Sequence, residues 1–178
     1  MKTIHVFFAV TLAAAASVFA APPAPTNTHV EVIFDHPEKF TDVKDSYMGS
    51  DKGRDNYLTL FKEYLQERAP RHMADGQTLT ITFTDIDMAG DFEPWRGPDF
   101  SDVRIVKEIY PPRMNFSYKL VDAGGGVVKE GQEKLLEMGF QMTSSMIDAQ
   151  DSLRYEKAML DNWLRDKLGR PKKAATGK

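Results

Sequence analysis

The chain has 178 residues, 42% of them hydrophobic and none of them cysteine. This length suits one domain whose core needs no covalent support, and the lack of cysteine excludes disulfides, thiolate metal sites, thiol nucleophiles and a lipid anchor of the bacterial lipoprotein type. The formal net charge of −3 argues against nucleic acid or an anionic membrane as the main partner.

The N-terminus has the pattern of a signal peptide. A short positive start is followed by an apolar run over residues 4–19, "IHVFFAVTLAAAASVF". Val18 and Ala20 are small residues at the two positions that signal peptidase reads, so we expect cleavage after Ala20. The run is shorter than the roughly 20 residues of a spanning helix, so no transmembrane anchor should remain after cleavage.

A proline-rich spacer over residues 21–28, "APPAPTNT", should lead into the folded part. The alternation in "HVEVIF" predicts a first strand over residues 29–34. Apolar residues at helical spacing in "RDNYLTLFKEYLQERAP" then predict an amphipathic helix that Pro70 ends. The strict alternation of "QTLTITFT" predicts the clearest strand, over residues 77–84.

Three further strands are expected. "DVRIVKEIY" predicts a moderate strand, and "RMNFSYKLVDA" and "VVKEGQEKLLEM" predict a hairpin around the glycines of residues 124–126. "DSLRYEKAMLDNWLRDKLGRP" predicts a closing helix with Asp151 as N-cap and Gly169 and Pro171 as its stop. The basic residues 169–178 read as a disordered tail.

The expected fold is therefore α+β, with residues 29–168 as a single globular domain. Its elements follow in the order strand, helix, four strands, helix. Because most of the later strands are joined by short turns, this order predicts an antiparallel or mixed sheet of about five strands, with both helices packed against one face.

The acidic stretch "DIDMAGDFEPW" after the second strand holds the candidate site. Five of its positions match a calcium loop of the helix-loop-helix kind; they are Asp85, Asp87, Gly90, Asp91 and Glu93. The match fails at Ala89, which offers no side-chain oxygen, and at Arg96, a cation where a bidentate glutamate should stand. A weak calcium site, an acid/base pair and a solvated strand exit therefore remain as alternatives.

The same stretch offers aromatic side chains. Trp95, with Phe92 and Phe100 nearby, forms either a platform for a sugar ring or peptide, or a cover for the end of the core. We take as candidate binding residues Asp85, Asp87, Asp91, Glu93, Trp95 and Arg96.

The signal peptide, "DIDMAGDFEPW", the hairpin "FSYKLVDAGGGVVKEGQEKLLEM" and the closing "LRYEKAMLDNWL" together resemble an exported bacterial family of unknown function, DUF3016. The most specific parts are "EPW" and the "LRYEK" helix with Trp163. The resemblance implies one compact domain and a periplasmic location. It supplies no activity, ligand or catalytic residue.

Two functions follow as hypotheses. The first is a non-enzymatic module that binds a periplasmic protein or another envelope component, because the sequence holds no nucleophile elbow and no phosphate-binding glycine loop. The alternative is a carboxylate-based hydrolase, assisted or not by a divalent metal in the stretch from Asp85 to Glu93.

Overall fold

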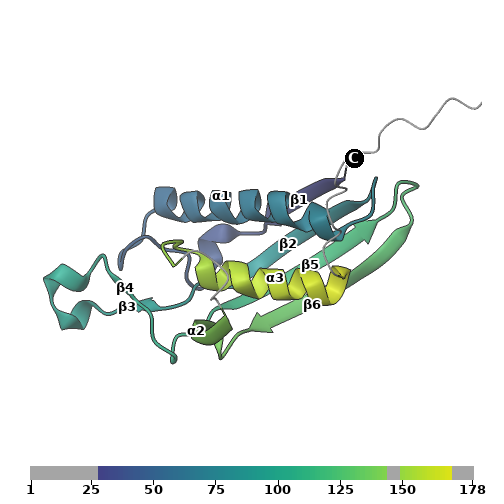
Figure 1. Cartoon of the computed structure of the whole chain (residues 1–178). Helices are drawn as coiled ribbons and strands as arrows, with labels where there is room; N and C mark the ends of the chain where they lie inside the picture. Colours follow the sequence, from purple (N-terminus) through teal and green to yellow (C-terminus); the bar gives the residue numbers. More distant parts are fainter. Residues whose placement is uncertain (1–27, 144–148, 170–178) are drawn as a thin grey trace, which may run out of the picture.

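The computed structural model describes residues 28–143 and 149–169. The expected signal peptide, almost all of the spacer and the basic tail beyond Gly169 lie outside the described residues. Between them the chain forms a single α+β domain, in which two long helices lie over one face of a sheet (Figure 1). No helix among the described residues has the length and apolarity needed to cross a membrane.

The main sheet is mixed and has four strands, in the order β1-β2-β5-β6. Their bounds are His29–Phe34 for β1, Thr78–Asp87 for β2, Arg113–Val121 for β5 and Val127–Leu136 for β6. β1 runs parallel to β2, and the other neighbours are antiparallel. The parallel pair requires a crossover connection, and α1, Asp51–Arg68, provides it.

α1 and the last helix, α3 at Arg154–Leu168, cover the same face of the sheet (Figure 1). α1 begins at Asp51, earlier than its apolar spacing indicates, because Ser50 accepts a hydrogen bond from the Gly53 N–H at 2.9 Å. α3 begins three residues after Asp151. The Asp151 carboxylate instead accepts the Leu153 N–H at 2.8 Å, so it caps the turn that precedes the helix.

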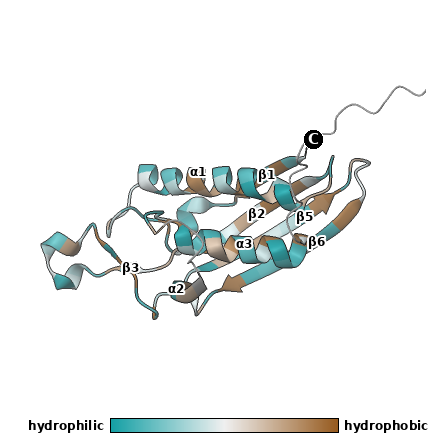
Figure 2. Cartoon of the chain, in the orientation of Figure 1, coloured by the Kyte–Doolittle hydropathy of each residue, from teal (hydrophilic) through white to brown (hydrophobic). Residues whose placement is uncertain are grey.

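The core lies between the helices and the sheet, where strand residues of one phase point inward. Figure 2 shows hydrophobic segments along the strands beneath the helices. A row of rings crosses the core: Phe83 contacts Phe116, and Trp163 of α3 meets Phe116 and Tyr118 edge-on. The predicted closing helix is thus confirmed, and its Leu160, Trp163 and Leu164 are buried.

The predicted strand "DVRIVKEIY" was wrong in length and in place. Only Arg104–Ile105, β4, is extended, and it pairs with β3, Asp91–Phe92, in a separate two-stranded sheet. The main sheet therefore has four strands, not five. The physical reason is that Arg104 pairs with Asp42 at the end of β2, and Lys107 pairs with Glu93 just after β3. These contacts hold the segment against β3 instead of along an edge of the main sheet.

Short helical turns complete the chain. The single turn α2, Phe140–Thr143, follows β6. The 3-10 turns η1, η2, η3 and η4 lie at Pro37–Lys39, Ala69–His72, Pro94–Arg96 and Pro98–Phe100.

Candidate functional site

Strand β2 continues three residues further than its alternation predicts, and it carries the first two acidic residues with it. A register shift between Phe83 and Asp85 marks a β-bulge at Thr84. The extra residue changes the phase of the strand, so that Ile86 is buried after Phe83. Asp85 and Asp87 consequently take the opposite phase from the core.

Residues 89–110 then leave the main sheet and form a projecting lobe, built from the β3–β4 hairpin and the turns η3 and η4 (Figure 1). The lobe begins at Gly90, whose φ of 82° lies in the left-handed region. A Cβ atom there would also lie 2.9 Å from the Ile105 carbonyl oxygen, so only glycine fits this turn without strain.

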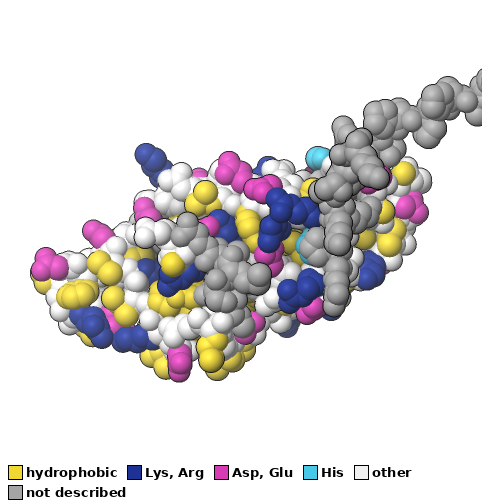
Figure 3. Space-filling model, viewed as in Figure 1, with side chains coloured by type: hydrophobic (Ala, Val, Ile, Leu, Met, Phe, Trp, Pro, Cys, Tyr) yellow, Lys and Arg dark blue, Asp and Glu magenta, His cyan; other side chains and the backbone are white. Residues whose placement is uncertain are grey.

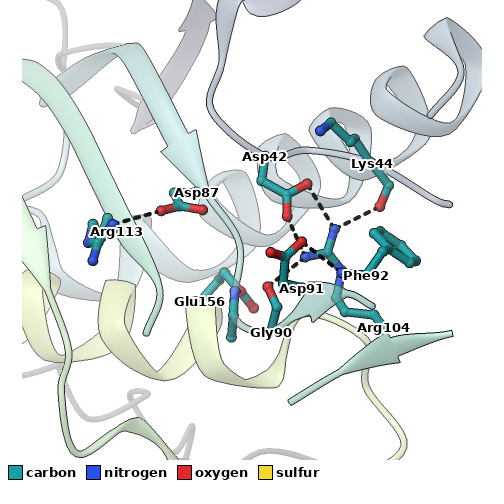
Figure 4. Close-up of polar contacts among 10 residues, drawn as sticks. Asp42, Lys44, Asp87, Gly90, Asp91, Phe92, Arg104, Arg113 and Glu156 are labelled. Carbon is teal, nitrogen blue, oxygen red and sulfur yellow. Dashed lines mark hydrogen bonds and ion pairs between the residues drawn. The ribbon is translucent and has the colours of Figure 1, made fainter. Parts of the chain in front are cut away.

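A buried ion pair joins the lobe to the body of the domain. Both terminal nitrogens of Arg104 donate to the Asp42 carboxylate, at 2.8 and 3.1 Å, and both side chains are mostly buried (14% and 10% exposed). The same guanidinium donates to the carbonyls of Gly90 and Lys44 and stacks over the Phe92 ring (Figure 4). This bidentate geometry fixes the lobe at its base. Neither residue was among the predicted site residues, since a pairing over such a sequence distance leaves no local pattern.

Glu93 holds the lobe together from inside. Its side chain is 2% exposed and accepts hydrogen bonds from Lys107, Arg96 and the Tyr110 hydroxyl. The hydrogen bond from Lys107 lowers the pKa of the Glu93 carboxyl below its ordinary value, and the other two donors act in the same direction against burial. Glu93 is therefore an ionised structural anchor, and the Arg96 side chain is engaged with it.

The other three predicted carboxylates have separate partners. Asp85 accepts the Thr41 N–H and hydroxyl, at 2.8 and 3.1 Å, and Asp91 accepts the Phe92 N–H at 2.7 Å. Asp87 pairs with Arg113 at 3.2 Å (Figure 4). Burial raises the pKa of the Asp87 carboxyl; the Arg113 charge opposes this shift, while the negative charges of Asp42 and Asp85 add to it.

These partners argue against the calcium alternative. Within residues 28–143 and 149–169, no three acidic or histidine side chains are grouped so as to hold a metal ion. Glu93 and Asp85 use their carboxylate oxygens to accept hydrogen bonds from other parts of the protein. The acidic stretch therefore connects separate segments of the chain.

A polar pocket of about 340 Å³ opens beside this stretch, between the lobe and the strand end. Asp87 and Asp91 line it together with Asp42, Lys44 and Arg113, whereas Asp85, Glu93, Trp95 and Arg96 do not. The charges are of both signs, and the lining contains no serine, cysteine or histidine. Its groups can donate and accept hydrogen bonds, and the Thr41 hydroxyl of the lining donates to the Asp85 carboxylate, which lies outside the lining.

Trp95 lies apart from this pocket, on η3 of the lobe, with 70% of its surface exposed. The predicted aromatic platform is divided: Phe92 is buried, while Phe100 is partly exposed. Trp95 also does not cover the end of the core, because its side chain is exposed. The loop before α1 adds exposed Tyr47 to this side, since the Tyr47 N–H donates to the Ser101 carbonyl at 3.0 Å. Figure 3 shows hydrophobic side chains among charged ones at this end of the molecule.

Glu156 on α3 contacts the start of the lobe and was not predicted as a site residue. It is 1% exposed, and one carboxylate oxygen accepts the Ala89 N–H at 2.6 Å. The other oxygen has no hydrogen-bond partner among the described residues. Burial raises the pKa of the Glu156 carboxyl to about 7. In the sequence, Glu156 is distinguished only by its position in the "LRYEK" segment, beside Tyr155.

Comparison with known families gives one match: residues 28–166 match a family described as "Protein of unknown function (DUF3016)". No curated protein and no solved structure matches the chain.

Proposed function

The chain belongs to the DUF3016 family of proteins of unknown function. We propose that it is exported to the cell envelope, where it binds another protein through the lobe of residues 89–110. The lobe is the part of the domain best suited to contact a partner. The proposal assigns binding to its exposed surface and a structural role to most of the acidic stretch.

One observation carries this proposal, which is the exposure of Trp95. Large aromatic side chains are costly to leave in water and are enriched among the residues that dominate binding energy at protein interfaces. Trp95 is 70% exposed, yet the backbone that bears it is held by the Arg104–Asp42 pair and by Glu93. A pre-positioned tryptophan loses little conformational entropy on binding, which favours recognition of a partner.

The polar contacts of the acidic stretch favour binding over hydrolysis. A pair of catalytic carboxylates needs one free acid and one free base facing the same substrate. Glu93 accepts hydrogen bonds from three protein side chains, Asp85 accepts two from Thr41, and Asp87 faces Arg113. Export is supported by the pattern of the first 20 residues.

A site-specific photo-crosslinker tests both parts of the proposal in one sample. The full chain, expressed in bacterial cells, carries the crosslinking amino acid at position 99, where exposed Asp99 lies on η4 of the lobe and Trp95 is kept, or at position 60 as the control, because Leu60 is an exposed apolar residue of α1. We expect the periplasmic protein to begin at Ala21 and to form a discrete adduct with a second protein only from position 99.

Each part can fail separately. Recovery of a folded periplasmic protein with no adduct at position 99, or with equal adducts at both positions, would contradict binding through the lobe. A chain retained in the cytoplasm with its first 20 residues intact would contradict export. Adding Trp95→Ala to the position-99 chain should abolish the adduct, while adding Leu60→Ala should leave it unchanged.

A further inference from the structure

Strand β6 forms an outer edge of the main sheet and is unusually long for that position. It has ten residues and pairs on one side with β5. No other strand of the described chain lies against its second side (Figure 1). The backbone groups on that side can therefore pair with a strand from another molecule.

The side chains of β6 alternate between a partnered and an unpartnered face. Glu133 on the helix side forms an ion pair with Lys167 of α3 at 2.9 Å, and the Lys129 ammonium donates a hydrogen bond to the Lys167 carbonyl. The open face carries Glu130, Gln132 and Lys134, all exposed. Neither Glu130 nor Lys134 takes part in any salt bridge seen among residues 28–143 and 149–169.

The charges on the open face are self-complementary in one antiparallel register. A two-fold axis perpendicular to the sheet brings side chains of the same face opposite each other. If Gln132 lies on this axis, Glu130 of each copy faces Lys134 of the other, which gives two ion pairs. In the same register exposed Leu136 of each copy lies near the β-bulge at Val128 of the other.

Neighbouring registers are less favourable. A shift of two residues sets Gln132 opposite either Glu130 or Lys134 and breaks both ion pairs. In the first case Lys129 faces Glu133, but both of these side chains already contact Lys167 of α3. In the second case two Glu133 side chains face each other, and like charges directly opposite are destabilising. The charges of the open face thus favour the register about Gln132.

We propose that two copies of this chain associate through β6, antiparallel about Gln132, to form one continuous eight-stranded sheet from two four-stranded ones. All long helices then lie on the same side, and the open faces of the two sheets join. A small groove of about 170 Å³ between α3 and β6, lined in part by Leu135 and Trp163, lies along the same edge and is covered in the dimer.

Charge reversal tests the register. Sedimentation velocity of the full exported chain, over a range of concentrations at low salt, should show a monomer–dimer equilibrium. Glu130→Lys and Lys134→Glu should each raise the dimer dissociation constant by about tenfold or more, because each turns attraction into repulsion at both ion pairs. The double reversal should restore the wild-type constant. Glu31→Lys, at the opposite edge on β1, is the control and should change nothing.

A single introduced thiol tests the position of the axis. The chain has no cysteine, so Gln132→Cys creates the only thiol, and mild oxidation should convert it to a disulfide dimer, whereas Glu31→Cys should stay monomeric. A wild-type chain that is monomeric at all concentrations, with no Gln132→Cys dimer, would overturn the proposal. A dimer whose dissociation constant is unchanged by both single charge reversals would overturn it as well.

Discussion

Glu156 is a buried carboxylate with one hydrogen-bonded oxygen, and this environment makes the stability of the domain depend on pH. Its pKa is about 7 in the folded state, against 4.5 for the ordinary carboxyl. Between these pH values the folded protein holds a proton that the unfolded chain has released. The contribution of Glu156 to the free energy of unfolding is thus greatest below pH 4.5 and falls as the pH rises toward 7.

We expect Glu156→Gln to remove this dependence. The neutral amide oxygen can still accept the Ala89 N–H, so the variant should match the wild type near pH 4.5 and exceed its stability above pH 7 by about 3 kcal/mol at most. Urea unfolding at a series of pH values measures the difference. The charged groups that act on Glu156 are Arg104 of β4 and Asp151 before α3. Parallel stability curves for the two proteins would refute this account.

The Asp42–Arg104 pair should be costly to break from one side. Arg104→Ala leaves the mostly buried Asp42 carboxylate without its partner, and we expect a loss of about 3–5 kcal/mol in the free energy of unfolding. The double variant Asp42→Ala with Arg104→Ala should lose less than the two single changes together, because it leaves no uncompensated charge. If the loss in the double variant equals the sum of the losses in the two single variants, the pair does not couple the lobe to the body.

At the scale of elements, α3 closes the core over the sheet. Its Trp163 contacts the rings of Phe116 and Tyr118, and Leu160 and Leu164 are fully buried. A chain that ends before Asp151 leaves this apolar face in water, so we expect no cooperative thermal transition. Trp163→Ala should cost about 3–5 kcal/mol, while Arg165→Ala, on the exposed side, should cost about 0.5 kcal/mol or less. An undiminished cooperative melt of the truncated chain would refute the role of α3.

The bulge at Thr84 shows where local patterns stop being informative. The alternation of Leu79, Ile81 and Phe83 predicted β2 correctly, because burial on one face imposes a period of two. No residue in "TDID" predicts the β-bulge, in which Thr84 has no partner on β5. The bulge decides which of Asp85 and Ile86 points inward, and it depends on pairing with β5, which follows far later in the chain.

For the whole molecule, the two long helices, the hairpin around Gly125 and all four main strands could be predicted, since each has its own periodicity and stop signals. The lobe could not. Its base depends on Asp42 and Arg104, and its interior on Glu93 and Lys107, residues that the fold brings together from separate segments. The sequence shows the acidic residues of the candidate site, but only the structure shows which groups each of them contacts.

The place of α3 as the last long element in chain order governs the timing of folding. Until residues 154–168 have been synthesised, no segment is present to cover the ring row of Phe116 and Tyr118. Strand β1 must also wait for β2, its one strand neighbour among the described residues. A nascent chain that has not yet reached residue 168 therefore lacks a complete core, and for the export proposed above it would still be the unfolded polypeptide that a threading route requires.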